Sequence, residues 1–320
     1  MPAAQDTLAV VADIGGTNTR VALSRGTEVE TRSIRRYRNA EADGIEGILR
    51  DYLTEMAVTP GAACVAMAGP VLDGRGTLTN LDWLVDRNRI AQATGAETVA
   101  VLNDLQAQGH ALAHIGPGSL MNLLPGETAS PQAARLVVGV GTGLNAAPVY
   151  RLGNQTLVPP AEAGHITIPV QDEDELRLMR DVAQYHGTPG IEDVLSGRGF
   201  ERIYRWMSRE SGSGIELSAA DIMAALGSDP LADKTVALFV RLLGRYAGNL
   251  ALVTLPFGGV YLCGGVAQHF GPHLLSNGFA EAFCDKGRFG PFMERFPVHL
   301  ITDDYAALTG CAGHLVEIMA

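Results

Sequence analysis

Lysine is nearly missing from this chain, and its scarcity removes the commonest phosphate-binding motifs. Only two of the 320 residues are lysines, Lys234 in D-K-T and Lys286 in D-K-G. A P-loop requires the pattern G-x-x-x-x-G-K-[ST], and a protein kinase requires a strand lysine of the V-A-I-K type. Neither lysine stands in such a setting, so the sequence excludes both of these classes of nucleotide-binding protein.

Cysteine and long apolar runs are scarce as well. The four cysteines are widely spaced and form no C-x-x-C pair, which argues against a disulfide framework or a zinc ribbon and favours reduced, mostly buried thiols: Cys64, Cys263, Cys284 and Cys311. No uninterrupted apolar run reaches the roughly 18 residues of a membrane span, and the N-terminal M-P-A-A-Q-D lacks the basic region of a signal peptide. We therefore expect a soluble, cytoplasmic protein with no membrane partner.

Net positive charge is also absent. The formal net charge of −11 argues against a nucleic-acid partner. The exception is the segment 32–38 (R-S-I-R-R-Y-R), which we interpret as the solvated face of a strand and turn. Hydrophobic content of 47% with 18% charged residues is typical of a packed globular enzyme. The length allows two domains, because single cores usually stop growing near roughly 250 to 300 residues.

What the chain does contain is a strand–turn–strand pattern that occurs twice. It is L-A-V-V-A-D-I-G-G-T-N-T-R-V-A-L at 8–23 and R-L-V-V-G-V-G-T-G-L-N-A-A-P-V at 135–149. The apolar runs predict buried strands, and the glycines offer freedom in φ and bare amide N–H groups. Either turn alone is equally well interpreted as an ordinary hairpin. Two such turns facing each other would hold a polyphosphate, because successive N–H groups form an anion-binding concavity without lysine.

A dinucleotide-binding interpretation of the second turn is disfavoured. The G-x-G-x-G run at 139–143 follows a strand, as the Rossmann fingerprint does. The residues 144–150 then continue as apolar, strand-type sequence, whereas the fingerprint would open a helix.

The pattern along the rest of the chain predicts an α/β protein. In the first part, we expect a third strand at 28–34, a helix at 45–56 and further strands at 62–69 and 97–103, which together suggest a mixed sheet. The second part is predicted to be mainly helical, with a closing strand and helix after it: 172–186, 198–210, 218–226, 231–255, then strands at 259–263 and 297–301 and a helix at 303–319. No low-complexity linker separates the halves, so we expect two domains with a tight, hinged interface.

Polar side chains stand where strands and loops should end. Asn103 and Asp104 close a predicted strand; Asp104 is equally well explained as a helix-capping residue or as a carboxylate at the ligand-binding end of a sheet. Glu162 and His165 lie in a loop, and Glu192 and Asn80 lie in other turns. Each of the latter taken singly is more simply structural. Together they supply the groups needed to hydrogen-bond several sugar hydroxyls.

Two histidine pairs have a spacing that suits metal ligands. His110 with His114, and His269 with His273, would each lie on one face of a helix. Neither pair has the glutamate of an H-E-x-x-H motif or a convincing third ligand, so we do not expect a transition metal.

Six ordered motifs resemble the bacterial glucokinases, a branch of the hexokinase, actin and heat-shock-chaperone ATPase superfamily, over essentially the whole chain. They are A-D-I-G-G-T-N-T-R at 12–20, L-N-D-L-Q-A-Q-G at 102–109, G-V-G-T-G-L-N at 139–145, E-A-G-H at 162–165, E-D-V-L-S-G at 192–197 and L-C-G-G-V-A at 262–267. The C-x-C-G zinc motif of a related sugar-kinase branch is missing, which favours the non-zinc branch. The chain departs from the family at Asn145, where relatives tend to carry glycine, and at Arg198, where proline is common.

The resemblance implies a fold and a reaction. The fold would be a two-domain, actin-like (ribonuclease-H-like) α/β ATPase with mixed sheets, with a small domain at 1–109 rejoined by a helix at 302–320 and a large domain at 110–301. The reaction would be ATP-dependent phosphorylation of glucose at its 6-hydroxyl, the entry step of glycolysis, in a cleft that closes on the sugar. Asp104 would be the general base. The sugar-binding set would be Asn80, Asn103, Asp104, Glu162, His165 and Glu192.

The resemblance also implies how ATP is held. The two glycine turns would contact the phosphates, and C-G-G-V at 263–266 would contact adenosine. The ATP-binding set would be Ala12, Asp13, Ile14, Gly15, Gly16, Thr17, Asn18, Gly141, Thr142, Gly143, Gly264 and Gly265. With no phosphate lysine, Mg²⁺ and backbone amides must offset the phosphate charge, and Asp13 would hold that Mg²⁺ through water. A homodimer is what the family leads us to expect.

Several alternatives stay open. The sugar could be mannose, fructose or N-acetylglucosamine, and the donor could be polyphosphate or ADP, although the adenosine-type motif favours ATP. A sugar-sensing regulator without turnover is an alternative of a different class. The chain has no spare segment for a DNA-binding helix-turn-helix, which argues against this alternative. A chaperone or filament ATPase is disfavoured because no peptide-binding domain or actin-like length is present. Sugar-dependent ATP consumption would separate the kinase from both.

Overall fold

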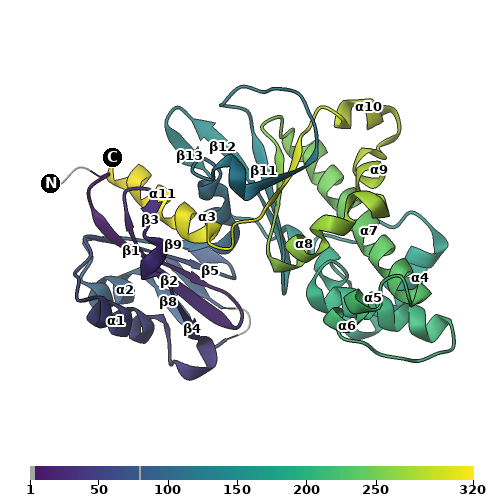
Figure 1. The fold of residues 1–320 in the computed structure, drawn as a ribbon, viewed down its shortest axis with the longest axis horizontal. Coiled ribbons are helices and arrows are strands. Elements are labelled where there is room, and N and C mark those ends of the chain that lie inside the picture. The colour runs from purple at the N-terminus through teal and green to yellow at the C-terminus, as the bar shows by residue number, and fades with distance from the viewer. Residues whose placement is uncertain (1–3, 79–80) are drawn as a thin grey trace. The chain divides into compact units, whose positions relative to one another are not determined.

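The computed structural model describes residues 4–78 and 81–320, which form two compact units (Figure 1). Unit 1 comprises Met1–Leu120, Ala147–Ala161 and Asp303–Ala320, and unit 2 comprises Met121–Ala146 and Glu162–Thr302. This division by packing assigns 110–120 and 147–161 to unit 1. The predicted division into a small domain at 1–109 with 302–320 and a large domain at 110–301 stays a prediction.

Unit 1 is built on a six-stranded mixed sheet. The strand order is β3-β2-β1-β5-β9, and β4 pairs with β2. The central pair β1–β2 is antiparallel, whereas β1, β5 and β9 run parallel, as the alternation of strands and helices predicted. The strands are β1 (Leu8–Ile14), β2 (Asn18–Arg25), β3 (Glu28–Val29), β4 (Arg35–Arg38), β5 (Ala62–Met67) and β9 (Thr98–Asn103). A small separate sheet comprises β6 (Val71–Leu72), β7 (Arg75–Thr77) and β8 (Leu84–Asp86).

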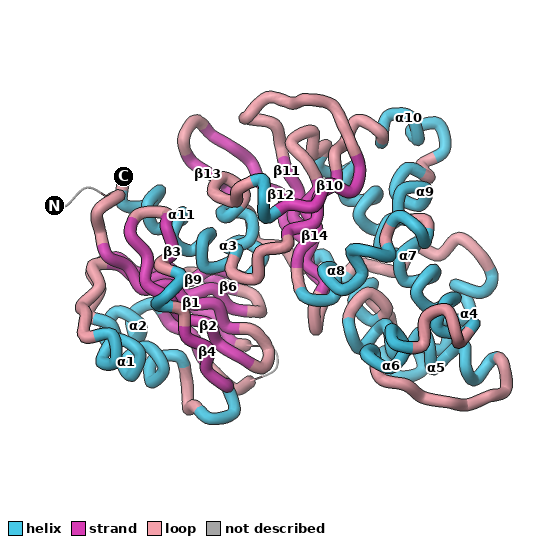
Figure 2. The backbone as a smooth tube through the Cα atoms, viewed as in Figure 1, coloured by secondary structure: helices cyan, strands magenta, loops and turns pink. Residues whose placement is uncertain are grey.

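Helices cover both faces of the main sheet of unit 1 (Figure 2). The helices α1 (Ile45–Met56) and α2 (Arg87–Thr94) contribute to the core on one face, and α3 (Asp104–Ala111) and α11 (Ala306–Met319) to the core on the other. Side chains of β1 alternate between these two cores. The strand is therefore buried on both sides, which explains why its sequence is a continuous apolar run.

The predicted third strand at 28–34 is wrong as a single element. The strand β3 ends at Val29, and a 3₁₀ turn at Thr31–Ser33 precedes β4. The hydroxyl of Ser33, which is buried, donates to the carbonyl of Glu30 at 2.6 Å and accepts from the amide of Leu23 at 2.9 Å. Short serine side chains compete in this way with the strand ladder, and here they turn the chain.

The second glycine turn lies in a second six-stranded sheet, most of which belongs to unit 2. The strand order is β10-β15-β14-β11-β12-β13, in which β11, β14 and β15 run parallel. Within it, β12 passes from unit 2 into unit 1 after Ala146. The strands are β10 (Leu120–Leu124), β11 (Arg135–Val140), β12 (Leu144–Leu152), β13 (Gln155–Leu157), β14 (Val260–Cys263) and β15 (Val298–Ile301).

The rest of unit 2 is helical, as predicted. Its helices are α4 (Glu173–His186), α5 (Gly197–Glu210), α6 (Ala219–Ala224), α7 (Pro230–Thr254), α8 (Gly265–Phe270), α9 (Phe279–Cys284) and α10 (Gly290–Met293). By length and composition, α7 could cross a membrane, with a mean hydropathy of 1.4 over its most apolar window. However, 67% of that window is buried, and α7 contributes large side chains to the core of unit 2. It is a core helix whose apolar character comes from burial on most sides.

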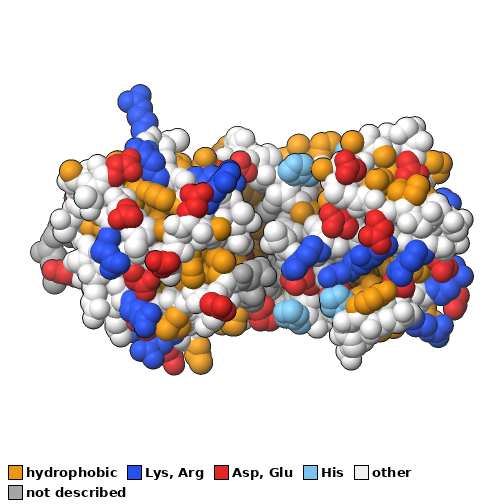
Figure 3. Space-filling model, turned by 90° about the horizontal axis from the view of Figure 1, so that it is seen from below, with side chains coloured by type: hydrophobic (Ala, Val, Ile, Leu, Met, Phe, Trp, Pro, Cys, Tyr) orange, Lys and Arg blue, Asp and Glu red, His pale blue; other side chains and the backbone are white. Residues whose placement is uncertain are grey.

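The thiols and the surface charges agree with the composition. Cys64, Cys263 and Cys311 are buried, and Cys284 is half-buried, as expected of mostly buried thiols. On the face drawn in Figure 3, acidic and basic side chains are mixed on each unit and are not sorted into one basic surface. Within the basic segment, Arg35 is paired with Glu55 at 2.8 Å.

Candidate functional site

The first glycine turn, in unit 1, is held by a side chain that no sequence motif indicated. The amide of Gly15 donates to the carbonyl of Asn18 at 3.0 Å. Asn39, only 3% exposed, donates from Nδ2 to the carbonyl of Gly15 at 2.8 Å and accepts from the hydroxyl of Thr19 at 2.8 Å. Asn39 therefore fixes the position of this turn from outside the motif.

Asp13 lies at the carboxyl end of β1, next to this turn. Its Oδ2 lies 3.3 Å from Nη1 of Arg20, its cross-strand partner on β2. Burial raises the pKa of the Asp13 carboxyl, and the Arg20 guanidinium opposes this shift. A carboxylate oxygen of this kind is a hard donor that suits Mg²⁺, which in proteins usually keeps several waters and takes only one or two carboxylates. The residues present therefore fit a water-mediated Mg²⁺ contact better than an all-protein cage.

The second glycine turn, in unit 2, is bonded to segments that carry candidate sugar-binding residues. The amide of Gly141 donates to the carbonyl of Gly143 at 2.8 Å, and the amide of Gly197 donates to the carbonyl of Gly141 at 3.0 Å. The amide of Leu144 donates to Oε2 of Glu192 at 2.7 Å. This turn thus contacts both the N-terminus of α5 and a carboxylate of the predicted sugar set.

The turn glycines are needed for a different reason from the one the sequence suggested. Gly15, Gly141 and Gly143 do not adopt positive φ, so freedom in φ does not explain them. A Cβ at Gly143 would lie 2.6 Å from Oε2 of Glu192, whereas one at Gly141 would meet nothing within 4 Å. Close approach to Glu192, and not backbone conformation, is what requires glycine at position 143.

The predicted adenosine segment lies beside the second turn. Gly264 follows β14 with a φ of 94°, and a Cβ there would lie 2.5 Å from the carbonyl oxygen of Val140 at the end of β11. The strands β11 and β14 are parallel, with Gly139 opposite Cys263. Their carboxyl ends therefore meet at one edge of the sheet, where α/β proteins bind ligands. Two of the three predicted ATP segments are brought together in unit 2.

Three of the predicted sugar residues also come together in unit 2. Glu162 and His165 flank a 3₁₀ turn at Ala163–His165, and Glu192 lies in another at Ile191–Asp193. The amide of Ile191 donates to the carbonyl of Ile166 at 2.7 Å and joins the two segments. Although Glu162 is largely exposed, partial desolvation raises the pKa of its carboxyl; His165 opposes the shift and Glu192 adds to it. The three side chains therefore share one electrostatic environment.

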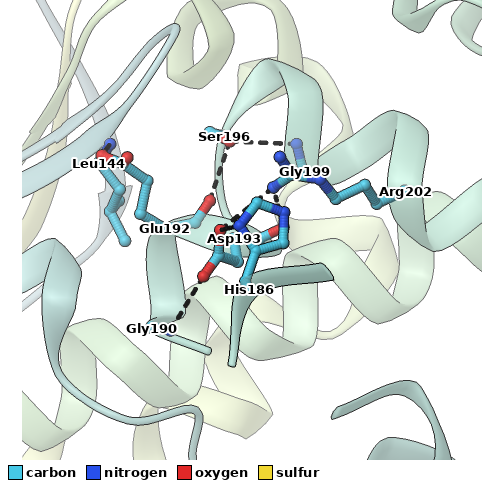
Figure 4. Close-up of polar contacts among 8 residues, drawn as sticks. All are labelled: Leu144, His186, Gly190, Glu192, Asp193, Ser196, Gly199 and Arg202. Carbon is cyan, nitrogen blue, oxygen red and sulfur yellow. Dashed lines mark hydrogen bonds and ion pairs between the residues drawn. The ribbon is translucent and has the colours of Figure 1, made fainter. Parts of the chain in front are cut away.

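A second layer of contacts fixes the turn that carries Glu192 (Figure 4). Oδ2 of Asp193 accepts from the amide of Gly190 at 3.0 Å, and Nη1 of Arg202 donates to the carbonyl of Asp193 at 2.9 Å. His186 lies with Nδ1 3.3 Å from Oδ1 of Asp193. The hydroxyl of Ser196 donates to the carbonyl of Glu192 at 2.9 Å. Sequence reasoning missed Asp193 and Arg202; the only available signal was that Asp193 belongs to the E-D-V-L-S-G motif.

Asn103 and Asp104 lie in unit 1, where β9 meets α3. Asn103, 3% exposed, is the N-cap: its Oδ1 accepts from the amide of Leu105 at 2.9 Å and its Nδ2 donates to the carbonyl of Gly69 at 3.0 Å. Gln106 completes a capping box by accepting from the amide of Asn103 at 3.0 Å. Asp104 is therefore a first-turn residue and not the cap, and its Oδ1 accepts from the amide of Leu105 at 2.8 Å. Asn80 lies outside the described residues.

The prediction that each histidine pair lies on one face of a helix is wrong. The helix α3 ends at Ala111 and α8 at Phe270, so each pair straddles a helix end. Among residues 4–78 and 81–320, no group of three His, Cys, Asp or Glu side chains is arranged to hold a metal ion. Instead, the ring of His110, 4% exposed, packs 4.4 Å from that of His314. Burial lowers the pKa of His110 to about 3, with smaller effects from His314 and His114.

Comparison with known proteins gives one consistent result. The sequence model of the family described as Glucokinase matches residues 10–318. A glucokinase of Pectobacterium atrosepticum is 34% identical over 313 residues, which is 97% of each chain. The crystal structure of a glucokinase from an Antarctic psychrotroph matches with a TM-score of 0.84 at 30% identity, over 97% of this chain and 98% of that one. A ROK family glucokinase from Streptomyces griseus in complex with glucose and AMPPNP shares the fold, with a TM-score of 0.65 at 21% identity over 95% of this chain and 98% of that one.

Proposed function

Because the chain belongs to the glucokinase family, we propose that Asp104 is the general base that activates the 6-hydroxyl of glucose for attack on the γ-phosphate of ATP. The enzyme is a kinase that uses ATP to phosphorylate glucose. The proposal concerns which residues perform the reaction and which metal ion binds with ATP.

The observation that best supports a kinase site in unit 2 is the 2.7 Å hydrogen bond from the amide of Leu144 to Oε2 of Glu192. A kinase must hold the acceptor and the phosphates in fixed relation, because positioning accounts for much of phosphoryl-transfer catalysis. Here the segment that would contact phosphate and a carboxylate that would contact sugar are directly bonded within unit 2.

We assign the sugar contacts to carboxylate, imidazole and amide groups from both units. Glu162 and Glu192 would accept hydrogen bonds from sugar hydroxyls, and His165 would donate or accept one. Asn103 would orient the start of α3, and its direct contact with glucose, like that of Asn80, stays a prediction. We expect sugar binding to organise the site, so that ATP hydrolysis without sugar stays low.

The phosphates would be held by backbone groups. The amides of Gly16, Thr17, Thr142 and Gly143 would donate to phosphate oxygens, whereas those of Gly15 and Gly141 donate to Asn18 and Gly143 within the turns. Gly264 and Gly265 would lie against adenosine. Asp13 would hold Mg²⁺ through water. When bound, Mg²⁺ neutralises phosphate charge, a need that is acute in a chain with only two lysines.

Asp104 would accept the proton of the 6-hydroxyl as the bond to phosphorus forms. Its position in the first turn of α3 is fixed by the Asn103 capping box and by the amide of Leu105. General-base catalysis of this kind contributes about 10² to 10⁴ in rate. A cytoplasmic location and a homodimer are further parts of the proposal and rest on the family alone.

The test is ADP formation from Mg-ATP with glucose, with mannose, fructose or N-acetylglucosamine, and without sugar. We expect glucose to stimulate turnover strongly and ATP hydrolysis without sugar to be low. Asp104→Asn, which keeps the shape of the side chain, should lower kcat at least 100-fold with a small effect on ATP affinity. Asp221→Asn, at a comparable first-turn position of α6, should not. An Asp104→Asn variant that keeps more than about a tenth of the wild-type kcat would refute the assignment of the base.

A further inference from the structure

We propose that Asn145 is a positioning residue for glucose, which holds the segment of Glu162 in place from the second strand of the phosphate turn. Its Oδ1 accepts from the amide of Ala163 at 2.9 Å and from the amide of Ala146 at 2.8 Å. Ala163 directly follows Glu162 in the chain. The inference rests on the proposed function, because it concerns how Glu162 is presented to the sugar.

The contact with Ala163 supplies a cap that the local sequence lacks. Ala163 begins the 3₁₀ turn Ala163–His165, and its N-cap residue, Glu162, makes no side-chain capping hydrogen bond. Amides at the start of a helical turn have no partner within the turn and need an external acceptor. Oδ1 of Asn145 is that acceptor. The backbone that carries Glu162 is thereby fixed, while its carboxylate makes no capping bond in the turn.

Close packing transmits any change at this point to the sugar residues. A Cβ at Gly164 would lie 1.9 Å from the carbonyl oxygen of Leu144, and one at Gly143 would lie 2.6 Å from Oε2 of Glu192. The segment 143–145 therefore touches both of the turns that carry the predicted sugar carboxylates. Interiors packed to this degree have little room to absorb a displaced backbone, so the loss of the Asn145 contact should move Glu162 and His165.

An amide suits this position better than an acid. The carboxyls of Glu162 and Glu192 already interact, and Glu192 raises the pKa of Glu162. A third carboxylate at position 145 would add repulsion between like charges, and it would face incoming phosphate as well. Asparagine provides an acceptor oxygen without charge.

The expected effect is selective for the sugar. Asn145→Ala leaves the Ala163 amide without its acceptor, which should raise the KM for glucose about five- to tenfold. The kcat and the KM for ATP should stay within about twofold, because the residues that would contact phosphate keep their own bonds. Asn145→Ser, whose hydroxyl oxygen can still accept, should recover part of the loss. Asn277→Ala, which removes a side chain bonded to the carbonyl of His273 in the same unit, should change none of these constants.

Glucose affinity should also be measured by isothermal titration calorimetry without nucleotide, so that binding is judged apart from turnover. A five- to tenfold weaker Kd for Asn145→Ala supports the proposal. An unchanged Kd, or an equal loss in glucose KM, ATP KM and kcat, overturns it, because the latter pattern is that of general structural damage. If the wild-type protein binds glucose but does not phosphorylate it, the proposed function is refuted, and the Asn145 proposal is then judged by the Kd for glucose alone. Wild-type protein that binds no glucose would refute both.

Discussion

The two glycine turns have similar sequences but are supported in different ways. In unit 1 the turn between β1 and β2 is held by Asn39, whose side chain bonds to Gly15 of the turn and to Thr19 of β2. In unit 2 the turn between β11 and β12 is bonded to the start of α5, to Glu192 and, through Asn145, to Ala163. A change in the first turn should therefore affect the nucleotide alone, whereas a change in the second should reach the sugar.

The two turns differ in the kind of segment to which they are bonded. The first turn lies between β1 and β2 of one sheet, and Asn39 directly follows β4, which pairs with β2 in the same sheet. The second turn accepts and donates bonds to segments about 20 to 50 residues away, whose backbone groups have no partners in regular structure. The second turn therefore supplies hydrogen-bond acceptors to these backbone groups, and it is thereby bonded to the segments that carry the predicted sugar-binding residues.

The largest effect should come from a buried ion pair between α4 and α7 in unit 2, whose arginine also binds Pro169 in the segment that follows the Ala163–His165 turn. Arg245 donates to Glu175 at 2.7 Å and to the carbonyl of Pro169 at 2.8 Å, and the two side chains are 8% and 3% exposed. Glu175→Gln leaves a buried arginine without its counter-charge, which should cost about 3 to 5 kcal/mol in unfolding free energy. Arg20→Gln, beside the first turn, should cost about 1 kcal/mol, because that pair is wider and partly exposed.

The measurement is urea unfolding followed by tryptophan fluorescence. Trp83 is buried in unit 1 and Trp206 in unit 2, so a Trp83→Phe background reports unit 2 and a Trp206→Phe background reports unit 1. If Arg20→Gln costs as much as Glu175→Gln, the two turns are supported equally and the comparison fails.

A smaller, pH-dependent effect should be confined to unit 1. The pKa of buried His110 is lowered from its ordinary 6.5 to about 3, so the unfolded state binds the proton more readily. The contribution of neutral His110 to the free energy of unfolding is complete above pH 6.5 and is lost as the pH falls toward 3. At pH 5 the loss should be about 2 kcal/mol, which can be measured as a lower urea midpoint for Trp83 fluorescence. His110→Gln should flatten this dependence; a wild-type midpoint that does not change between pH 8 and pH 5 would contradict it.

The smallest effect should show that the first turn acts on ATP binding and the second on glucose binding. Asn39→Ala removes the contacts with Gly15 and Thr19, and we expect a loss of about 1 kcal/mol, seen as a KM for ATP about fivefold higher. The KM for glucose should not change, in contrast to the effect of Asn145→Ala. Initial-rate kinetics with each substrate varied in turn would measure both constants. A rise in glucose KM in Asn39→Ala would show that the first turn is also coupled to the sugar.

Features set by neighbouring residues could be predicted from the sequence. The apolar stripe of α1 and the buried runs of β1 and β11 are visible as periodic patterns, and both strand–turn–strand segments fold as expected. The prediction failed at 28–34, where the hydroxyl of Ser33 turns the chain, and at the histidine pairs, where each helix ends three residues before the second histidine. In each case the residue spacing suits the predicted element, but a local hydrogen bond or a helix end prevents that element from forming over the whole segment.

The candidate site could be predicted only as a set of residue types. The motifs contain Glu162, His165 and Glu192, but nothing in their spacing indicates that Leu144 donates to Glu192 or that Asn145 caps the turn after Glu162. The reason for Gly143 was also hidden, because it depends on the position of a carboxylate 49 residues later in the chain. Such contacts join segments whose order in the chain does not reveal their distance in space.

The sequence alone determined the strands, the helices, the two glycine turns and the absence of a phosphate lysine, because each depends on residue type and short-range periodicity. The tertiary structure decided which turn is tied to the sugar residues, which side chains complete the caps and which histidine is kept neutral. These outcomes depend on hydrogen bonds and burial between distant segments: a buried amide or imidazole takes whatever partner the packed chain brings to it.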